Sequence, residues 1–107
     1  MKVLFDQGTP VPLRRVLTDH VVSTAYEMGW SMLVNGDLLD AAEAAGFEVL
    51  VTTDKNLPYQ QALAGRRFGV LILPTTDWST IRRHVADVAS ALGGLRPDDA
   101  LELTFDE

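Results

Sequence analysis

The chain has 107 residues, no cysteine and a formal net charge of −6 at pH 7. This length fits a single domain with one hydrophobic core, here taken over residues 1–107. Without cysteine, disulfides and thiolate metal sites are excluded, and the acidic balance argues against nonspecific nucleic-acid binding through a broad basic surface. The opening MKVLFDQG lacks the pattern of a secretory signal. No apolar run approaches the roughly 20 residues of a membrane span, so we expect a cytoplasmic protein.

The first part of the chain predicts a strand, a helix and a second strand. Residues 2–5 form a short continuous apolar run, which is typical of a strand buried on both faces. Thr9 as a cap and Pro10 at the first helical position predict a short helix that ends near Leu17. A second strand is expected over residues 20–25.

The middle of the chain repeats this alternation. A helix rich in alanine and leucine is expected to begin at Asn35 or Asp37 and to close on Gly46, which suits the left-handed position after a helix end. Residues 47–53 predict a third strand. Residues 56–67 predict a turn and a short helix that a glycine interrupts.

The last third contains the clearest helix. Residues 68–74 predict a fourth strand, and residues 100–107 predict a fifth, whose alternating apolar residues suit an edge position. Residues 75–94 carry an apolar stripe at helical spacing, formed by Trp78, Ile81, Val85, Val88 and Leu92. Strands that alternate with helices predict an α/β fold, a three-layer α/β/α sandwich with a mainly parallel sheet of four to five strands.

Acidic residues follow several of the expected strands. Asp6 comes after the first strand, Asp54 after the third and Asp77 after the fourth, while Asp37 begins the central helix. Sites in an open parallel sheet form outside the carboxyl ends of its strands. Carboxylates that converge there repel one another, and a hard cation such as Mg²⁺ or Mn²⁺ relieves that repulsion. Such an ion would activate water and stabilise charge on a phosphodiester.

Each acid also has a purely structural interpretation. Asp37 and Asp77 fit plain helix caps, and Asp54 fits a turn residue followed by Asn56 as the cap. Asp6 is harder to explain in this way, because glycine and proline already supply the turn that follows it. The pair Asp6 and Asp54, at the ends of two strands, is what favours a site.

Two stretches resemble a known family. Residues 1–17 (MKVLFDQGTPVPLRRVL) and residues 35–56 (NGDLLDAAEAAGFEVLVTTDKN) are similar to the two signatures of PIN-like proteins of the DUF5615 (Mut7-C-like) group. The resemblance covers roughly residues 1–75. It implies a PIN-like fold and a metal-dependent endoribonuclease of the toxin type, which hydrolyses RNA phosphodiester bonds and has an antitoxin partner.

Position by position, the resemblance implies that Asp6, Asp37 and Asp54 are catalytic and hold Mg²⁺ or Mn²⁺, and that Asp77 matches a weaker fourth acid. The implied supporting groups are Gln7, Thr52 and Asn56. The residues assigned to hold RNA phosphates are Lys55, Arg14 and Arg15.

Other interpretations stay open. Gln7 stands where the family usually has an acid, which favours a catalytically degenerate binding or partner subunit. Asp6, Asp54 and Thr75 or Thr76 also mimic a receiver-type phosphoacceptor domain, although no lysine follows residue 55. Residues 28–34, with two methionines and a tryptophan, fit core packing best; the alternative is a surface for a homodimer or another partner.

Overall fold

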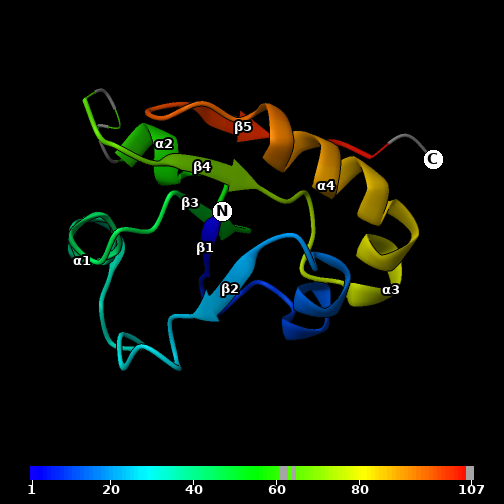
Figure 1. Ribbon diagram of the computed structural model, residues 1–107, viewed down its shortest axis with the longest axis horizontal. Coiled ribbons are helices and arrows are strands. Elements are labelled where there is room, and N and C mark those ends of the chain that lie inside the picture. The colour runs from blue at the N-terminus through cyan, green and yellow to red at the C-terminus, as the bar shows by residue number, and fades with distance from the viewer. Residues whose placement is uncertain (61–62, 64, 106–107) are drawn as a thin grey trace.

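The computed structural model describes residues 1–60, 63 and 65–105. In chain order the elements are β1 (Lys2–Phe5), the 3₁₀ helix η1 (Val11–Val16), β2 (Val21–Thr24), α1 (Asn35–Ala44), β3 (Val49–Thr52), α2 (Leu57–Gln60), β4 (Gly69–Ile72), α3 (Trp78–Ile81), the 3₁₀ helix η2 (Arg82–His84), α4 (Val85–Gly94) and β5 (Ala100–Glu102). In the described part of the chain, five strands form one sheet in the order β2-β1-β3-β4-β5 (Figure 1). Every neighbouring pair is parallel. The expected α/β fold is therefore confirmed.

The three central strands bury both of their faces. Successive side chains of a strand point to opposite faces of the sheet, so Val3 and Phe5 of β1 join one apolar cluster while Leu4 joins the other. Val49 and Leu50 of β3 divide in the same way. This arrangement explains why each of these strands is a continuous apolar run in the sequence.

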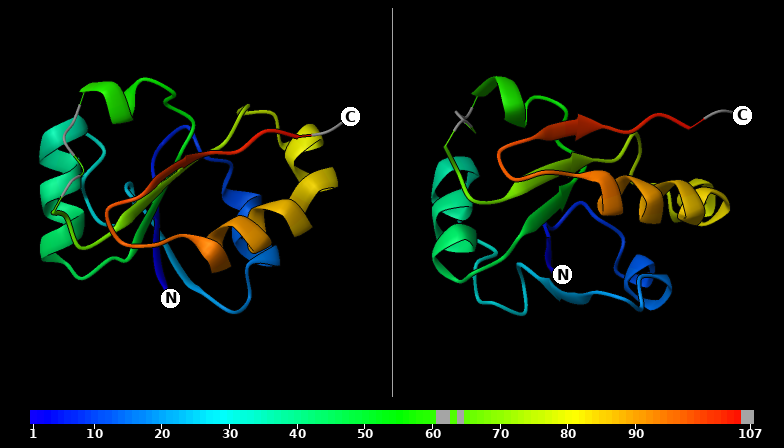
Figure 2. Two further views of the ribbon diagram at one scale, coloured as in Figure 1. Left: turned by 90° about the horizontal axis from the view of Figure 1, so that it is seen from above. Right: turned by 45° about the horizontal axis from the view of Figure 1, so that its top comes forward.

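Helices cover the two faces of the sheet and complete three layers. On one face α1 and α2 insert Leu39 and Leu57 into the first cluster. On the other face η1, α3 and α4 contribute Leu13, Ile81 and Leu92 to the second cluster. Figure 2 shows α1 and α2 on one side of the strands and η1, α3 and α4 on the other.

The helix expected over residues 75–94 is broken in the structure. α3 and α4 are separated by η2, and the backbone of His84 leaves the helical region at φ −126° and ψ 25°. The ring of His84 stacks on Phe105 with centroids 4.3 Å apart. The apolar stripe still packs as expected, because Ile81 and Val88 are fully buried in the second cluster. The break accompanies a long-range contact that helical periodicity does not encode.

Smaller differences concern caps and edges. The first helix is a 3₁₀ helix, and its N-cap is Pro10 rather than the expected Thr9. Gly46 has the expected positive φ of 83°. β5 lies at the edge as predicted, although Leu101 is 40 % exposed there. In the expected helix at 56–67, α2 covers Leu57–Gln60, and residues 61, 62 and 64 lie outside the described residues. None of the helices formed by the described residues is long and apolar enough to cross a membrane.

Candidate functional site

Asp6 and Asp54 lie at the same end of the sheet. Asp6 directly follows β1, and Asp54 lies two residues beyond β3, which is the neighbouring strand. Both line a cavity of about 190 Å³, here called the Asp54 cavity. In the sheet, β2 lies on one side of β1, and β3, β4 and β5 lie on its other side. The strand order therefore reverses between β1 and β3, where the cavity lies. Doubly wound sheets place their ligand sites at such a point.

The carboxylate of Asp6 is held by three donors. Its Oδ1 accepts hydrogen bonds from the Gly8 backbone N–H at 3.2 Å and from the Thr9 hydroxyl at 2.9 Å. Its Oδ2 accepts from the hydroxyl of Thr52. The Thr9 hydroxyl also lies 2.8 Å from the carbonyl oxygen of Val51 on β3. The loop after β1 is therefore fixed to the end of β3 through the acid itself.

Burial raises the pKa of Asp6 above the ordinary value of an aspartate, because the carboxylate loses water that would stabilise its charge. The hydrogen bonds from Thr52, Thr9 and Gly8 act in the opposite direction, since they favour the ionised form. Desolvation is the larger effect. A cation next to Asp6 would favour the ionised form again.

Asp54 has a structural role as well as a place in the cavity. Its Oδ1 accepts from the backbone N–H of Asn56 at 3.0 Å, and its carbonyl oxygen accepts from Leu57 N–H at 3.3 Å. The turn role therefore belongs to Asp54 itself, immediately before α2. Thr52 connects the two acids, because its fully buried hydroxyl donates to Asp6 and accepts from the Asp54 N–H at 3.1 Å.

Gly8 permits the close approach of the two loops. A Cβ atom added to Gly8 would lie 2.5 Å from Oγ1 of Thr53. Glycine therefore fits this position without rotation of the Thr53 side chain and without separation of the loop after β1 from the end of β3.

The other two predicted acids, Asp37 and Asp77, do not line the Asp54 cavity. Asp37 is exposed in the first turn of α1 and is not among the residues that line the Asp54 cavity, although its neighbour Leu38 is. Asp77 caps α3: its Oδ1 accepts from Ser79 N–H at 3.2 Å and its Oδ2 from the Thr80 hydroxyl at 2.9 Å. Its structure matches the helix-cap interpretation.

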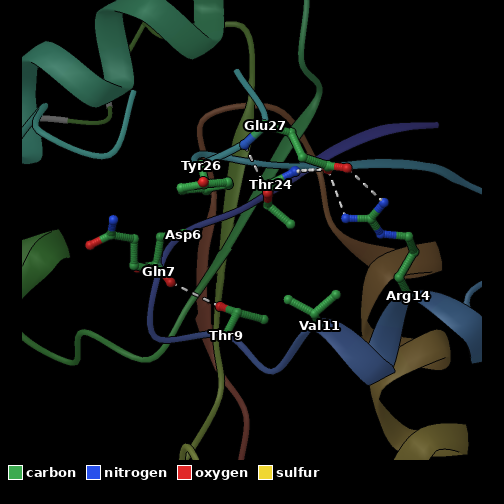
Figure 3. Close-up of a pocket in the computed structure, with 8 residues that line it drawn as sticks. All are labelled: Asp6, Gln7, Thr9, Val11, Arg14, Thr24, Tyr26 and Glu27. Atoms are coloured by element: carbon green, nitrogen blue, oxygen red, sulfur yellow. Dashed lines mark hydrogen bonds and ion pairs between the residues drawn. The ribbon is translucent and has the colours of Figure 1, made fainter. Parts of the chain in front are cut away.

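A second, larger cavity adjoins the first. It measures about 590 Å³ and is here called the Tyr26 cavity (Figure 3). It lies beyond the ends of β1 and β2, where the labelled side chains surround it and Gln7 and Arg14 lie at opposite ends. Its lining consists of Asp6, Gln7, Thr9, Val11, Arg14, Thr24, Tyr26 and Glu27. Asp6 and Gln7 line both cavities.

The wall of the Tyr26 cavity contains a fixed ion pair. Arg14 donates to both carboxylate oxygens of Glu27, at 2.7 and 3.1 Å. Glu27 and Thr24 also bond reciprocally, since Glu27 Oε1 accepts from Thr24 N–H at 2.9 Å and Thr24 Oγ1 accepts from Glu27 N–H at 3.1 Å. The hydrogen bonds and charge of Arg14 lower the pKa of Glu27. Arg14 is therefore already paired, whereas Arg15 and Lys55 are exposed.

Sequence reasoning missed Thr9, Tyr26 and Glu27. The spacing of Thr24 and Glu27 matches the Thr-x-x-Glu pattern of a capping box, so this signal was available. For Thr9 the pattern pointed to a helix cap. Its bond to Asp6 spans only three residues, whereas its contact with the Val51 carbonyl depends on the pairing of β1 with β3. No local pattern marks Tyr26 as a cavity residue.

The oxygen donors at this end of the sheet fit a hard cation only in part. Among the described residues, no group of three or more histidine, aspartate or glutamate side chains is arranged to hold a metal ion. Mg²⁺, however, is often held by one or two carboxylates together with water and substrate phosphates. Asp6 and Asp54 line one cavity, and in the described part of the chain Oδ2 of Asp54 makes no hydrogen bond. Of the four predicted acids, these two are the ones that share a cavity.

The strand order is also compatible with the receiver-type interpretation, because receiver domains use the same doubly wound order. Thr75 at the expected hydroxyl position accepts the N–H of Asp77 at 3.1 Å within the cap of α3. The phosphoacceptor hypothesis stays a prediction.

No model of a known family matches the chain, and no curated protein or solved structure matches it either.

Proposed function

We propose that the protein is a PIN-like, Mg²⁺- or Mn²⁺-dependent endoribonuclease whose site is centred on Asp6 and Asp54. The observation that carries this proposal is that these two acids, from the ends of adjacent parallel strands, line one cavity. When bound, the ion would supply an activated water and stabilise charge on the phosphodiester. The resemblance of residues 1–17 and 35–56 to the DUF5615 group supports the same class of activity.

In this proposal Asp6, Asp54 and Gln7 have different roles. Asp6 would hold the ion, and the hydroxyls of Thr9 and Thr52 fix the orientation of its carboxylate. Asp54 would contribute its unbonded oxygen. Gln7 is exposed beside Asp6 and lines the same cavity, so its amide would position water or substrate without adding charge.

Substitution of Asp54 tests the assignment. Asn at this position keeps an oxygen that can accept the Asn56 N–H, so Asp54→Asn should retain the turn and remove only the charge. We expect this variant to lose Mn²⁺-dependent cleavage of single-stranded RNA while its melting temperature stays close to that of the parent. Asp77→Asn is the matched control, because Asp77 has the same local bonding in the cap of α3 and should leave cleavage unchanged. Equal cleavage by Asp54→Asn and the parent would contradict the proposal.

A second candidate is a catalytically degenerate binding subunit of the same fold. It is favoured by the absence of a three-acid group among the described residues and by Gln7 in place of an acid. A thermal-shift titration with Mn²⁺ separates the two, because an ion that binds the folded state raises the melting temperature by linkage. A rise that is lost in Asp54→Asn supports the nuclease, and no rise at millimolar Mn²⁺ supports the degenerate subunit.

A further inference from the structure

The proposed metal site at Asp6 and Asp54 accounts for neither the size nor the lining of the Tyr26 cavity. Its volume of about 590 Å³ is roughly three times that of the Asp54 cavity, at about 190 Å³. Small-molecule sites commonly occupy about 300–1,000 Å³ and combine apolar walls with a few fixed polar groups. Val11 and Tyr26 provide apolar wall, and Thr24 and Glu27 provide the polar groups.

Three hollows adjoin along this side of the molecule. Asp6 and Gln7 line both the Asp54 cavity and the Tyr26 cavity. A third hollow of about 480 Å³, here called the Arg15 groove, contains Arg15 and shares Val11, Arg14 and Glu27 with the Tyr26 cavity. The three hollows are therefore neighbours, in a row from Asp54 to Arg15. A linear polymer would occupy all three hollows, whereas a single small ligand would fill only the Tyr26 cavity between the other two.

The polar groups of the Tyr26 cavity offer one donor and one acceptor from the same turn. The Thr24 oxygen accepts from Glu27 N–H, and in the described part of the chain its own proton has no acceptor. Oε2 of Glu27 accepts a single bond, from Arg14 at 3.1 Å, and so keeps one lone pair. The hydrogen bonds from Arg14 also lower the pKa of Glu27, which favours its ionised form. Base edges present adjacent donors and acceptors of this kind.

The side chain of Tyr26 is the aromatic surface at this cavity. It is 78 % exposed, so its ring is available to a ligand. Unpaired bases in RNA are commonly stacked on such rings, and stacking tolerates any base because every base has a π-face. Arg14 is neutralised by Glu27, which leaves Arg15 as the exposed cation of the groove.

We propose that the Tyr26 cavity is a subsite for one unpaired nucleobase of a single-stranded RNA. The base stacks on Tyr26 and bonds to Thr24 and Glu27, one flanking phosphate lies toward Asp6, and the chain continues toward Arg15. This inference rests on the proposed function for its choice of RNA. It adds a base-binding residue, Tyr26, that the acid site does not require.

The test measures binding separately from cleavage. A fluorescently labelled single-stranded RNA is titrated with the parent protein in EDTA, and an abasic chain of equal length and a mononucleotide, AMP, are titrated in parallel. Tyr26→Ala removes the ring, Tyr26→Phe keeps it, and Leu101→Ala removes an exposed apolar side chain at the opposite edge of the sheet. We expect Tyr26→Ala to bind the RNA between about fivefold and 150-fold more weakly. Tyr26→Phe and Leu101→Ala should bind like the parent.

The parent should also bind the abasic chain more weakly than the RNA, with no further loss in Tyr26→Ala. Equal RNA binding by Tyr26→Ala and the parent, or no RNA binding by the parent, would overturn the subsite. AMP that binds as tightly as the RNA would assign the cavity to a free nucleotide and overturn the binding of a chain across the three hollows. If RNA binding depends on Tyr26 but the parent shows no Mn²⁺-dependent cleavage, the subsite stands and the proposed ribonuclease activity is overturned. If the parent cleaves RNA and Tyr26→Ala has an unchanged kcat/KM, the ribonuclease activity stands and the subsite is overturned.

Discussion

Gly8 offers the sharpest test of how the site is built. In Gly8→Ala the new Cβ would lie 2.5 Å from Oγ1 of Thr53, well inside the roughly 3.5 Å of an optimal contact between non-bonded atoms. The Thr53 oxygen sits on the first side-chain atom, so it moves only if the side chain rotates or the two loops separate. Forced contacts of this kind cost about 1–3 kcal/mol. In a domain of this size each kcal/mol lowers the melting temperature by about 4–8 °C.

A double-mutant cycle with Thr53→Ala isolates the clash. Without the hydroxyl, the atoms nearest to the new Cβ would be Oδ1 of Asp6 at 3.8 Å and Cβ of residue 53 at 3.9 Å, which are ordinary distances. Urea unfolding of the parent, both single variants and the double variant should therefore give a coupling energy of about 1–3 kcal/mol. If Gly8→Ala lowers the free energy of unfolding by the same amount with and without the Thr53 hydroxyl, the close approach to that hydroxyl is not the cause of the loss. Separation of the loops would also displace Asp6, so RNA cleavage should recover in the double variant.

Two further predictions concern the environment of Asp6. Thr52→Val removes a fully buried hydroxyl that serves both acids, so we expect a loss of about 1–3 kcal/mol in urea unfolding, whereas Thr52→Ser should retain most of the stability. The raised pKa of Asp6 means that the folded protein binds more protons than the unfolded chain, so the stability contributed by this group is lost as pH rises above the ordinary aspartate range. In EDTA we expect the stability of Asp6→Asn relative to the parent to fall as the pH is lowered from 7 toward 4, because only the parent gains stability by binding a proton at this position. A pH-independent difference between the two proteins would contradict the burial effect.

The strand ends were predictable because they depend on local sequence. An apolar run that stops at a polar residue marks the end of a buried strand in any parallel sheet, and this places Asp6 after β1 and Asp54 beyond β3. Which strands are neighbours does not follow from such runs. The pairing of β1 with β3, which brings the two acids to one cavity, is a property of the whole fold.

The limits of prediction are clearest at Asp37 and His84. The pattern correctly begins a helix near Asp37, but helical periodicity fixes only the face of a residue, and the direction of the first turn relative to the sheet depends on tertiary packing. The expected single helix over residues 75–94 breaks near His84, whose ring stacks on Phe105 from the end of the described chain. A contact 21 positions away in sequence lies beyond any window of helical spacing.

The hydrogen bonds between Thr24 and Glu27 also bear on edge-to-edge association between copies of this protein. β2 is an edge strand, and Val21 and Ala25 direct their N–H groups to β1, so the backbone of Thr24 faces outward. Its N–H is taken by Glu27 and its carbonyl oxygen by Met28 N–H at 3.1 Å. The last outward-facing position of the strand therefore has no free backbone group for another chain to pair with. Exposed strand edges are starting points for aggregation, and the Glu27 side chain closes this one at its carboxyl end, where Thr24 lies.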